Sequence, residues 1–229
     1  MKEPSTSNAR HRCIRLRRPA TVASVEGPFV PDGASAADVE RHWQALRAAN
    51  SAYFEGRILH VLGVHRNGHG GATVHVVECA YRYYAVGERG LDTGVRPLGV
   101  KGFTLAGDAV LLGQRAAHVG GYPGCWEFAP GGGLEPGVAP EEMVRRELFE
   151  ETGLRPSVAP VPIAVLYDAV MRTWELVYRL RVAGADHPAP TREYPALRWI
   201  AVRSLLAGER PGTLSPIART MLGLLTEAP

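Results

Sequence analysis

Hydrophobic and polar residues in the first part of the chain recur in patterns that predict strands and one helix. Alternation between residues 12 and 26 predicts a strand, and the turn-forming stretch GPFVPDGAS follows it. Apolar residues then recur at helical spacing from Val39, which predicts a helix capped by Ser35. Residues 57–66 and 73–86 are rich in β-branched and aromatic residues, and the intervening NGHGG suits a hairpin turn. Three tyrosines of the second strand are interpreted as packing residues rather than as a surface for a base: Tyr81, Tyr83 and Tyr84.

A second region rich in predicted strands begins near residue 95. Gly107 and Asp108 form a pair that is typical of the tight turn between two strands. The predicted elements are two strands within 96–116, a hairpin over 161–183, a strand over 195–202 and a last helix from Pro216, capped by Ser215. This order predicts an α+β fold in which a mixed β-sheet lies between helices.

The stretch from Gly131 to Leu154 predicts a helix with a particular chemistry; it reads GGGLEPGVAPEEMVRRELFEETGL. Gly131–Gly133 are expected to form a loop before the helix. Pro140 suits the first turn of the helix, and Gly153 suits its left-handed end. Within the helix three glutamates stand at positions i, i+3 and i+4, so they share one face at spacings of about 5 to 6 Å. They are Glu147, Glu150 and Glu151.

Three carboxylates so close together repel one another unless a cation lies between them. Hard divalent ions such as Mg²⁺ or Mn²⁺ prefer oxygen ligands and would reverse the penalty. Met143, Val144 and Leu148 supply an apolar face that can dock the helix on a sheet. The alternative is a solvent-exposed acidic helix stabilised by Arg145 and Arg146, which the neighbouring glycines make less favourable.

This segment resembles the nudix box, whose pattern is G-x5-E-x7-R-E-U-x-E-E-x-G-U, with U an aliphatic residue. The matching positions are Gly132, Arg146, Glu147, Leu148, Glu150, Glu151, Gly153 and Leu154. One position departs from the pattern, because Val138 stands where the first glutamate belongs. Ala139 also lacks the side-chain oxygen that a helix cap provides, and Glu135 lies nearby as a partial substitute.

The resemblance implies a nudix fold and hydrolysis of a phosphoanhydride bond with Mg²⁺ or Mn²⁺ as cofactor. It implies that the metal ligands are Glu147, Glu150, Glu151 and the backbone carbonyl of Gly131. Glu147 is then expected to position or deprotonate the attacking water, and Arg146 to orient Glu147.

Other site residues are expected outside this helix. Members of the family often use a further carboxylate from a loop, and Glu193 is the candidate here, with Asp168 and Glu175 as rivals. The expected substrate-binding residues are Arg115, Gly132, Gly133 and Tyr122.

Composition and charge narrow the class of protein. With 45% hydrophobic and 21% charged residues, the chain is expected to form a packed core. It lacks a long apolar run and a secretory signal, so a cytoplasmic protein without membrane contact is expected. Three widely spaced cysteines, Cys13, Cys79 and Cys125, are expected to be reduced thiols.

Positive charge is concentrated in residues 1–18, which carry Lys2, Arg10, Arg12, Arg15, Arg17 and Arg18 against Glu3. Such an arm could attract nucleic acid, but the alternation of its apolar residues favours an edge strand. Nucleic acid is therefore not the expected partner, and a small nucleotide is.

The expected organisation is an N-terminal α/β extension over 1–94 and a nudix domain over 95–229. The extension faintly resembles part of two-domain nudix proteins that cleave UDP-glucose, which makes a nucleotide sugar the first expected substrate, ahead of ADP-ribose or NADH. A homodimer is a possible assembly. Two alternatives stay open: a nudix-fold sensor that binds a nucleotide without turnover, and an isopentenyl diphosphate isomerase that would need Cys125 in its pocket.

Overall fold

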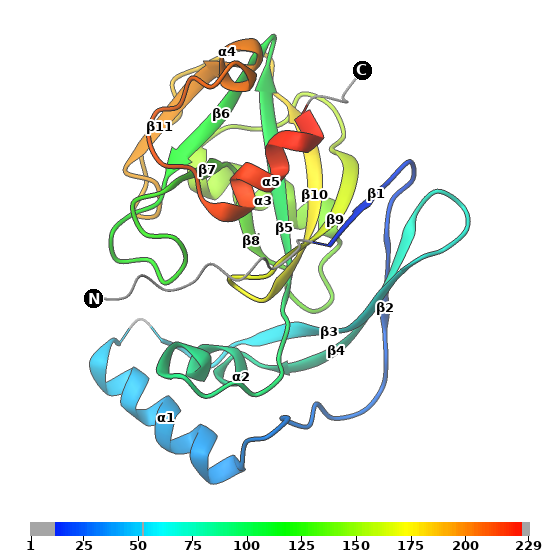
Figure 1. Ribbon diagram of the computed structural model, residues 1–229, viewed down its shortest axis with the longest axis vertical. Helices are drawn as coiled ribbons and strands as arrows, with labels where there is room; N and C mark the ends of the chain where they lie inside the picture. Colours follow the sequence, from blue (N-terminus) through cyan, green and yellow to red (C-terminus); the bar gives the residue numbers. More distant parts are fainter. Residues whose placement is uncertain (1–11, 52, 226–229) are drawn as a thin grey trace.

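A computed structural model describes residues 12–51 and 53–225 of the chain. It contains two β-sheets, a large one of eight strands and a small one of three, which lie one above the other in Figure 1. The small sheet has two helices beside it, and the large sheet has helices on its two faces.

The small sheet has the order β2-β4-β3 and forms most of the N-terminal part. Its hairpin confirms the predicted pairing on either side of NGHGG, with Arg57 opposite Ala80 and Arg66 opposite Ala72. Ser35 caps the helix beside it, as predicted, by accepting a hydrogen bond from the backbone of Asp38 at 3.1 Å. The elements are β2 (Thr21–Ser24), α1 (Ala36–Ala49), β3 (Arg57–Arg66), β4 (Ala72–Ala80), α2 (Arg82–Ala85) and the 3-10 helix η1 (Val86–Arg89).

The large sheet is mixed, as predicted, because β5 and β10 run parallel while the other pairs are antiparallel. Its order is β1-β9-β10-β5-β6-β11, with β7 also paired to β6 and β8 to β5. The strands are β1 (Cys13–Arg15), β5 (Leu98–Ala106), β6 (Ala109–Gln114), β7 (Trp126–Phe128), β8 (Gly131–Gly133), β9 (Val161–Asp168), β10 (Thr173–Arg181) and β11 (Ala196–Ala201).

Helices cover both faces of this sheet, which confirms the predicted sandwich. Helix α3 (Pro140–Thr152) buries Met143, Val144 and Leu148 against one face. Helix α5 (Pro216–Leu225) packs on the other face with Phe103 and Phe128, and the short helix α4 (Val202–Leu206) follows β11. Ser215 accepts a hydrogen bond from the backbone of Ala218, as expected of a cap.

Three local predictions were wrong. The strand expected over 12–26 is two strands in different sheets, because the chain turns near Pro19, where the backbone nitrogens of Arg17 and Arg18 donate to Gly70. The strand expected over 73–86 ends at Ala80. The tyrosines that follow belong to a turn and to α2, because tertiary packing overrides their strand propensity.

The third wrong prediction concerns Gly131–Gly133, which form the strand β8 rather than a loop. This strand pairs with the start of β5, so that Gly131 lies opposite Lys101 and Gly133 opposite Gly99. The glycine segment is thus tied into the large sheet by backbone hydrogen bonds, which fixes its position against helix α3.

The predicted boundary at residue 94 stays a prediction, although the small sheet does consist of residues before it. Strand β1 also precedes that boundary, and it pairs with β9 at the edge of the large sheet. An edge strand is what the alternation in the basic arm predicted. Residues 1–11 of that arm, including Lys2, Glu3 and Arg10, lie outside the described residues.

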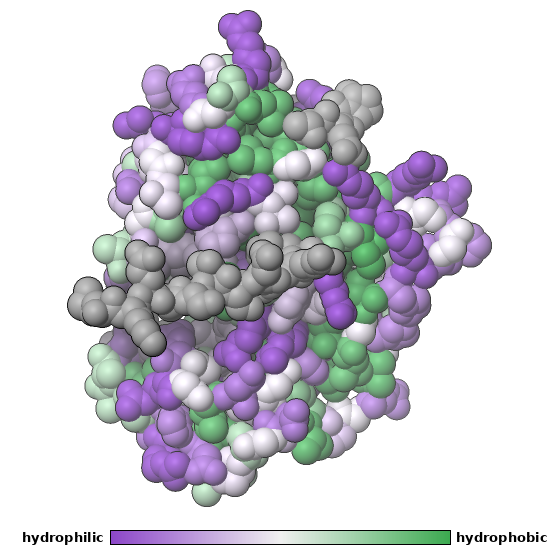
Figure 2. Space-filling view, in the orientation of Figure 1, coloured by the Kyte–Doolittle hydropathy of each residue, from purple (hydrophilic) through white to green (hydrophobic). Residues whose placement is uncertain are grey.

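The surface is largely hydrophilic at its most prominent points, including the tip of the β3–β4 hairpin (Figure 2). None of the helices described is both long and apolar enough to span a membrane. Cys13, Cys79 and Cys125 are free thiols, as expected.

Candidate active site

Helix α3 begins and ends where the sequence predicted. Pro140 occupies the first turn, and Ala139 has the extended backbone of a cap but makes no side-chain capping hydrogen bond. Gly153 adopts φ 74°, and its backbone nitrogen donates to the carbonyl of Phe149 at 2.8 Å. Because one face of the helix is buried in the core, its backbone is held in a fixed position relative to the large sheet.

Glu151 lies buried between helix α3 and the glycine strand β8. Its Oε2 accepts a hydrogen bond from the backbone nitrogen of Gly131 at 3.1 Å. Its Oε1 is buried and has no hydrogen-bond partner among the described residues. Burial raises the pKa of Glu151 well above its usual value, and the charges of Glu193 and Glu147 raise it further.

Glu147 lies against the backbone of Gly132. A Cβ at Gly132 would come within 2.3 Å of the carboxyl carbon of Glu147, so only glycine leaves room for this side chain. Burial, followed by the charges of Glu150 and Glu193, raises the pKa of Glu147 to about 7. Two carboxyl groups of α3 therefore share a small, acidic space behind β8.

Glu150 differs from the other two acids because its side chain is 60% exposed. Arg146 lies 4.0 Å from it and makes a closer ion pair, at 2.7 Å, with Glu135. That Arg146 orients Glu147 stays a prediction, since the ion pairs of its guanidinium go to these other two carboxylates. Val138, which replaces the first glutamate of the box, packs against the hydrophobic core.

Glu193 is the acid outside the helix that affects both of these glutamates. Glu193 lines the cavity together with Gly131 and Gly132, the glycines that Glu151 and Glu147 contact, and its charge raises the pKa of both glutamates. It forms an ion pair with the guanidinium of Arg115, the residue predicted to face the phosphates. The structure thus brings four predicted site residues together, although it does not assign their roles.

The rival carboxylates are buried and have partners of their own. Asp168 accepts hydrogen bonds from the Tyr122 hydroxyl at 2.7 Å and from two backbone nitrogens. Glu175 accepts one from the Thr173 hydroxyl at 2.7 Å, and burial raises the pKa of Glu175 to about 7. Both carboxylates line the same cavity as Glu193.

Sequence reasoning missed a buried ion-pair cluster at the base of the site. Glu127 lies 3.2 Å from the Lys101 amine and 3.4 Å from the Arg115 guanidinium, and it accepts a hydrogen bond from the Tyr194 hydroxyl at 2.7 Å. Burial raises the pKa of Glu127, but the two cations outweigh it and hold that pKa below its usual value. The available signal was a single charge inside an otherwise apolar strand, in WEF for Glu127 and in LGVKGF for Lys101.

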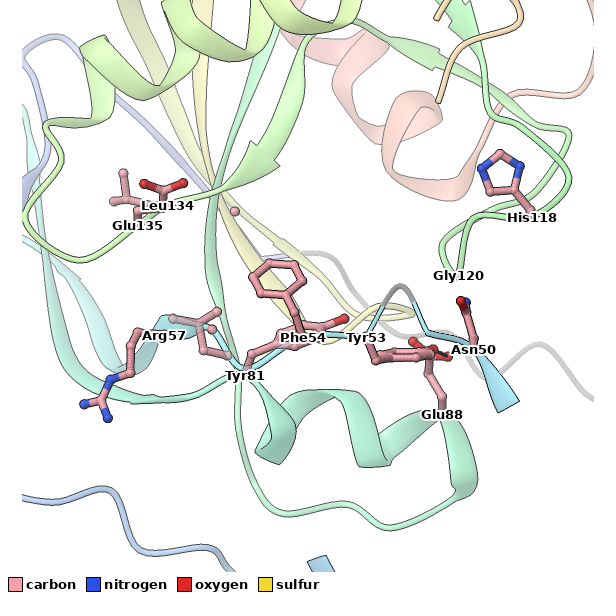
Figure 3. Close-up of a pocket in the computed structure, with 13 residues that line it drawn as sticks. Asn50, Tyr53, Phe54, Arg57, Tyr81, Glu88, His118, Gly120, Leu134 and Glu135 are labelled. Carbon is pink, nitrogen blue, oxygen red and sulfur yellow. Dashed lines mark hydrogen bonds between the residues drawn. The ribbon is translucent and has the colours of Figure 1, made fainter. Parts of the chain in front are cut away.

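These side chains surround a cavity of about 300 Å³. Its lining includes Lys101, Arg115, Tyr122, Glu127, Gly131, Gly132, Gly133, Asp168, Glu175 and Glu193. A second cavity, of about 500 Å³, adjoins it and is drawn in Figure 3. The linings of the two cavities share Ile58, Tyr81 and Gly133. All four predicted substrate-binding residues thus lie at the first cavity, and Glu147 and Glu151 of α3 contact the glycines of its wall.

Whether these residues suit a divalent cation can be judged from their chemistry. Within residues 12–51 and 53–225, no group of three or more His, Cys, Asp or Glu side chains is already placed to hold a metal ion. Glu147 and Glu151 nevertheless form a close acidic pair, and Glu151 has a buried oxygen without a partner. Hard cations prefer such oxygen donors, so the chemistry of Glu147 and Glu151 fits a divalent ion.

Comparisons with known proteins agree with this architecture. A family model described as NUDIX domain matches residues 95–222, more than half of the chain. An RNA pyrophosphohydrolase of Roseobacter denitrificans is 31% identical over 121 residues, which cover 42% of this chain and 71% of that protein. The nucleoside triphosphatase NudI of an Enterobacter species is 42% identical over 67 residues, which cover 29% of this chain and 47% of that protein. The chain thus spans about half the length of this second relative.

A solved structure of a MutT NUDIX hydrolase from Burkholderia pseudomallei is also similar. It is 22% identical, its TM-score is 0.45, and the match covers 56% of this chain and 95% of that one.

Proposed function

The chain belongs to the NUDIX family of hydrolases, and we propose that it hydrolyses the phosphoanhydride of a nucleoside diphosphate linked to a sugar, with Mg²⁺ or Mn²⁺ as cofactor. The observation that carries this proposal is the pair of Glu147, which is half-buried, and Glu151, which is buried, because both side chains contact the backbone of β8. Carboxylates held this close are stable as anions only when a cation offsets their repulsion.

The residues that would hold the cation are Glu147, Glu150, Glu151 and the carbonyl of Gly131. When bound, a divalent ion would offset the negative charge of the diphosphate and lower the pKa of the attacking water. Glu147 is our first candidate to accept the proton of that water, because Gly132 allows its carboxyl group to reach the wall of the cavity. Glu193 is the second, since it lines the cavity and lies near the same acids.

Arg115 and Lys101 would serve the diphosphate from the other side of the cavity. Both are cations of the cavity wall, and Glu127 holds both in place by ion pairs. A diphosphate oxygen that approaches Arg115 would compete with Glu193 for the guanidinium. Release of Glu193 from that ion pair would leave its carboxylate available to the reaction.

The carboxylates of the cavity support a sugar as the second moiety. Asp168 and Glu175 line it, and carboxylates accept hydrogen bonds from hydroxyl groups. A triphosphate would bring further negative charge to these acids, which makes it a poorer fit. UDP-glucose is our first substrate, and ADP-ribose and NADH are the next.

A second candidate function is a sensor that binds a nucleotide without turnover. The observation that favours it is Val138, which packs against the hydrophobic core where the family pattern has a glutamate. The close pair of Glu147 and Glu151 is the argument for turnover.

A substrate panel separates the two functions. The purified protein is incubated with Mg²⁺ or Mn²⁺ and, in turn, UDP-glucose, ADP-ribose, NADH, nucleoside triphosphates and a 5′-triphosphorylated RNA, with a chelator in parallel reactions. The RNA and the nucleoside triphosphates are included because one relative is named an RNA pyrophosphohydrolase and the other a nucleoside triphosphatase. We expect metal-dependent release of a nucleoside monophosphate and a sugar phosphate from a nucleotide sugar. Binding of nucleotides without any product would refute the hydrolase and support the sensor.

A further inference from the structure

The larger cavity beside the site lies between the two halves of the molecule. Its volume is about 500 Å³, within the range of about 300 to 1,000 Å³ that small-molecule sites occupy. In Figure 3 the side chains of Tyr53, Phe54 and Tyr81 approach it from the N-terminal part. The segment of Leu134 and Glu135, next to the glycines of β8, borders it from the opposite side.

Phe54 has an unusual environment for a large apolar side chain. It is 70% exposed, although burial of a phenylalanine is worth roughly 1.5 to 3 kcal/mol to a fold. In Figure 3 its ring projects from the chain segment before β3 into the space between the two halves. An exposed aromatic face at the mouth of a cavity is suited to a planar ligand.

The ring is held from behind by a second aromatic residue. Phe54 and Tyr81 lie nearly parallel, with 23° between their planes and 6.5 Å between their ring centres. Gly56 lies between them, since a Cβ there would come within 3.2 Å of the Phe54 ring. The backbone nitrogen of Tyr81 donates to Gly56 at 2.9 Å, and the Trp43 ring contacts the Tyr81 ring edge-on at 6.4 Å. The platform is therefore supported before any ligand arrives.

The position of this platform relative to the phosphates follows from the shared walls. Tyr81 and Gly133 line both cavities, so a ligand can extend from one into the other without leaving the cleft. The smaller cavity is lined by the two cations Lys101 and Arg115, whereas the larger one exposes the Phe54 ring and has two acids, Glu88 and Glu135, in its wall. The cations favour the smaller cavity for the diphosphate, which leaves the larger one for the planar base.

We propose that Phe54, supported by Tyr81, is the stacking platform for the base of the nucleotide. The inference rests on the proposed function, because it assumes that the diphosphate lies at the glycines of β8. Stacking on an aromatic ring tolerates every base and contributes about 1 to 3 kcal/mol per base. The N-terminal part would therefore select nucleotides over other diphosphates, while the nudix domain cleaves them.

Equilibrium binding tests this without turnover. Wild type, Phe54→Ala, Phe54→Trp and the control Leu62→Ala are titrated calorimetrically with UMP, AMP and the base-free ribose 5-phosphate, all with Mg²⁺. Leu62 is a matched control because it is 53% exposed and lies on strand β3, outside the linings of both cavities. Since Phe54 is exposed, its replacement leaves the core intact, and thermal unfolding of each variant checks this.

We expect Phe54→Ala to weaken the tighter of the two nucleotides by tenfold or more, and to change ribose 5-phosphate binding by less than twofold. Phe54→Trp and Leu62→Ala are expected to retain the wild-type affinity. The inference is overturned if Phe54→Ala leaves nucleotide affinity unchanged, if it weakens ribose 5-phosphate equally, or if neither nucleotide binds the wild type more tightly than ribose 5-phosphate.

Kinetics separate failure of this inference from failure of the proposed function. If the wild type hydrolyses a nucleotide sugar, Phe54→Ala is expected to raise KM by tenfold or more with a smaller change in kcat. Hydrolysis with an unchanged KM in Phe54→Ala would refute base stacking on Phe54 and would leave the proposed hydrolase activity supported. If Phe54→Ala weakens nucleotide binding but not ribose 5-phosphate binding, and the wild type hydrolyses no substrate, base stacking on Phe54 is supported and the proposed hydrolase activity is refuted.

Discussion

Replacing Gly132 by alanine is the sharpest test of the site geometry. The new Cβ would lie 2.3 Å from both Cδ and Oε1 of Glu147, whereas an ordinary contact needs at least 3.4 Å. Glu147 must therefore retreat by about 1 Å, and a displacement of that size can cost about a hundredfold in rate. We expect kcat/KM to fall by about that factor, equal to about 2.7 kcal/mol of transition-state stabilisation.

The assay compares Gly132→Ala with Gly63→Ala, a strand glycine with nothing within 4 Å of its added Cβ. Each variant is assayed at saturating Mg²⁺ on the best substrate of the panel, and thermal unfolding confirms that it is folded. Gly63→Ala should retain its activity. A folded Gly132→Ala with near-normal kcat/KM would refute the reasoning, because Glu147 would then have no need of its present position.

Other predictions concern single carboxylates. Glu151→Gln should lower turnover by at least about a hundredfold, while Glu142→Gln, an exposed residue of the same helix, should not; similar rates in product-release assays would contradict the ligand assignment. Glu127→Gln should lower the free energy of unfolding by about 3 to 5 kcal/mol, because it leaves the buried Lys101 without its ion-pair partner and Arg115 with Glu193 alone. Urea unfolding measures this loss, and Glu78→Gln, which removes an exposed ion pair, is the control and should lower the free energy of unfolding by less than about 1 kcal/mol. Equal losses in the two variants would argue against a buried ion-pair cluster. The pKa of Glu175 is raised by burial from 4.5 to about 7, so this group makes the protein less stable as pH rises from 4.5 through 7. Glu175→Gln should remove that loss, so its free energy of unfolding should exceed that of the wild type by up to about 3 kcal/mol at pH 8 and equal it near pH 4.5. If the unfolding free energies of the two proteins change in parallel with pH, Glu175 is not the group responsible.

Sequence predicted the elements whose signals are local. The caps Ser35 of α1 and Ser215 of α5, and the start and end of α3 at Pro140 and Gly153, depend on neighbouring residues. The turn at Gly107 and Asp108 and the hairpin of β9 and β10 were predicted for the same reason. The nudix box lies within one such stretch, so the acidic pair of the site could be predicted together with its helix.

What sequence could not predict depends on contacts between distant segments. Lys101 and Glu127 meet because strands β5, β6 and β7 are neighbours, and Arg115 meets Glu193 across a separation of 78 residues. Tyr81 was expected inside a strand, yet it forms part of the cavity wall, because the chain turns there to pack against Trp43. Such contacts follow from the topology, which the pattern of one segment does not contain.

Strand β1 has a consequence for how the catalytic half can be isolated. Cys13, Ile14 and Arg15 pair with Leu166, Val165 and Ala164 of β9, although the family match begins only at residue 95. A fragment cut at that residue would expose a row of unpaired backbone groups along β9, a template on which further copies can assemble. A catalytic fragment that begins at residue 95 is therefore expected to assemble less when residues 13–15 are restored, either fused to it or added as a peptide.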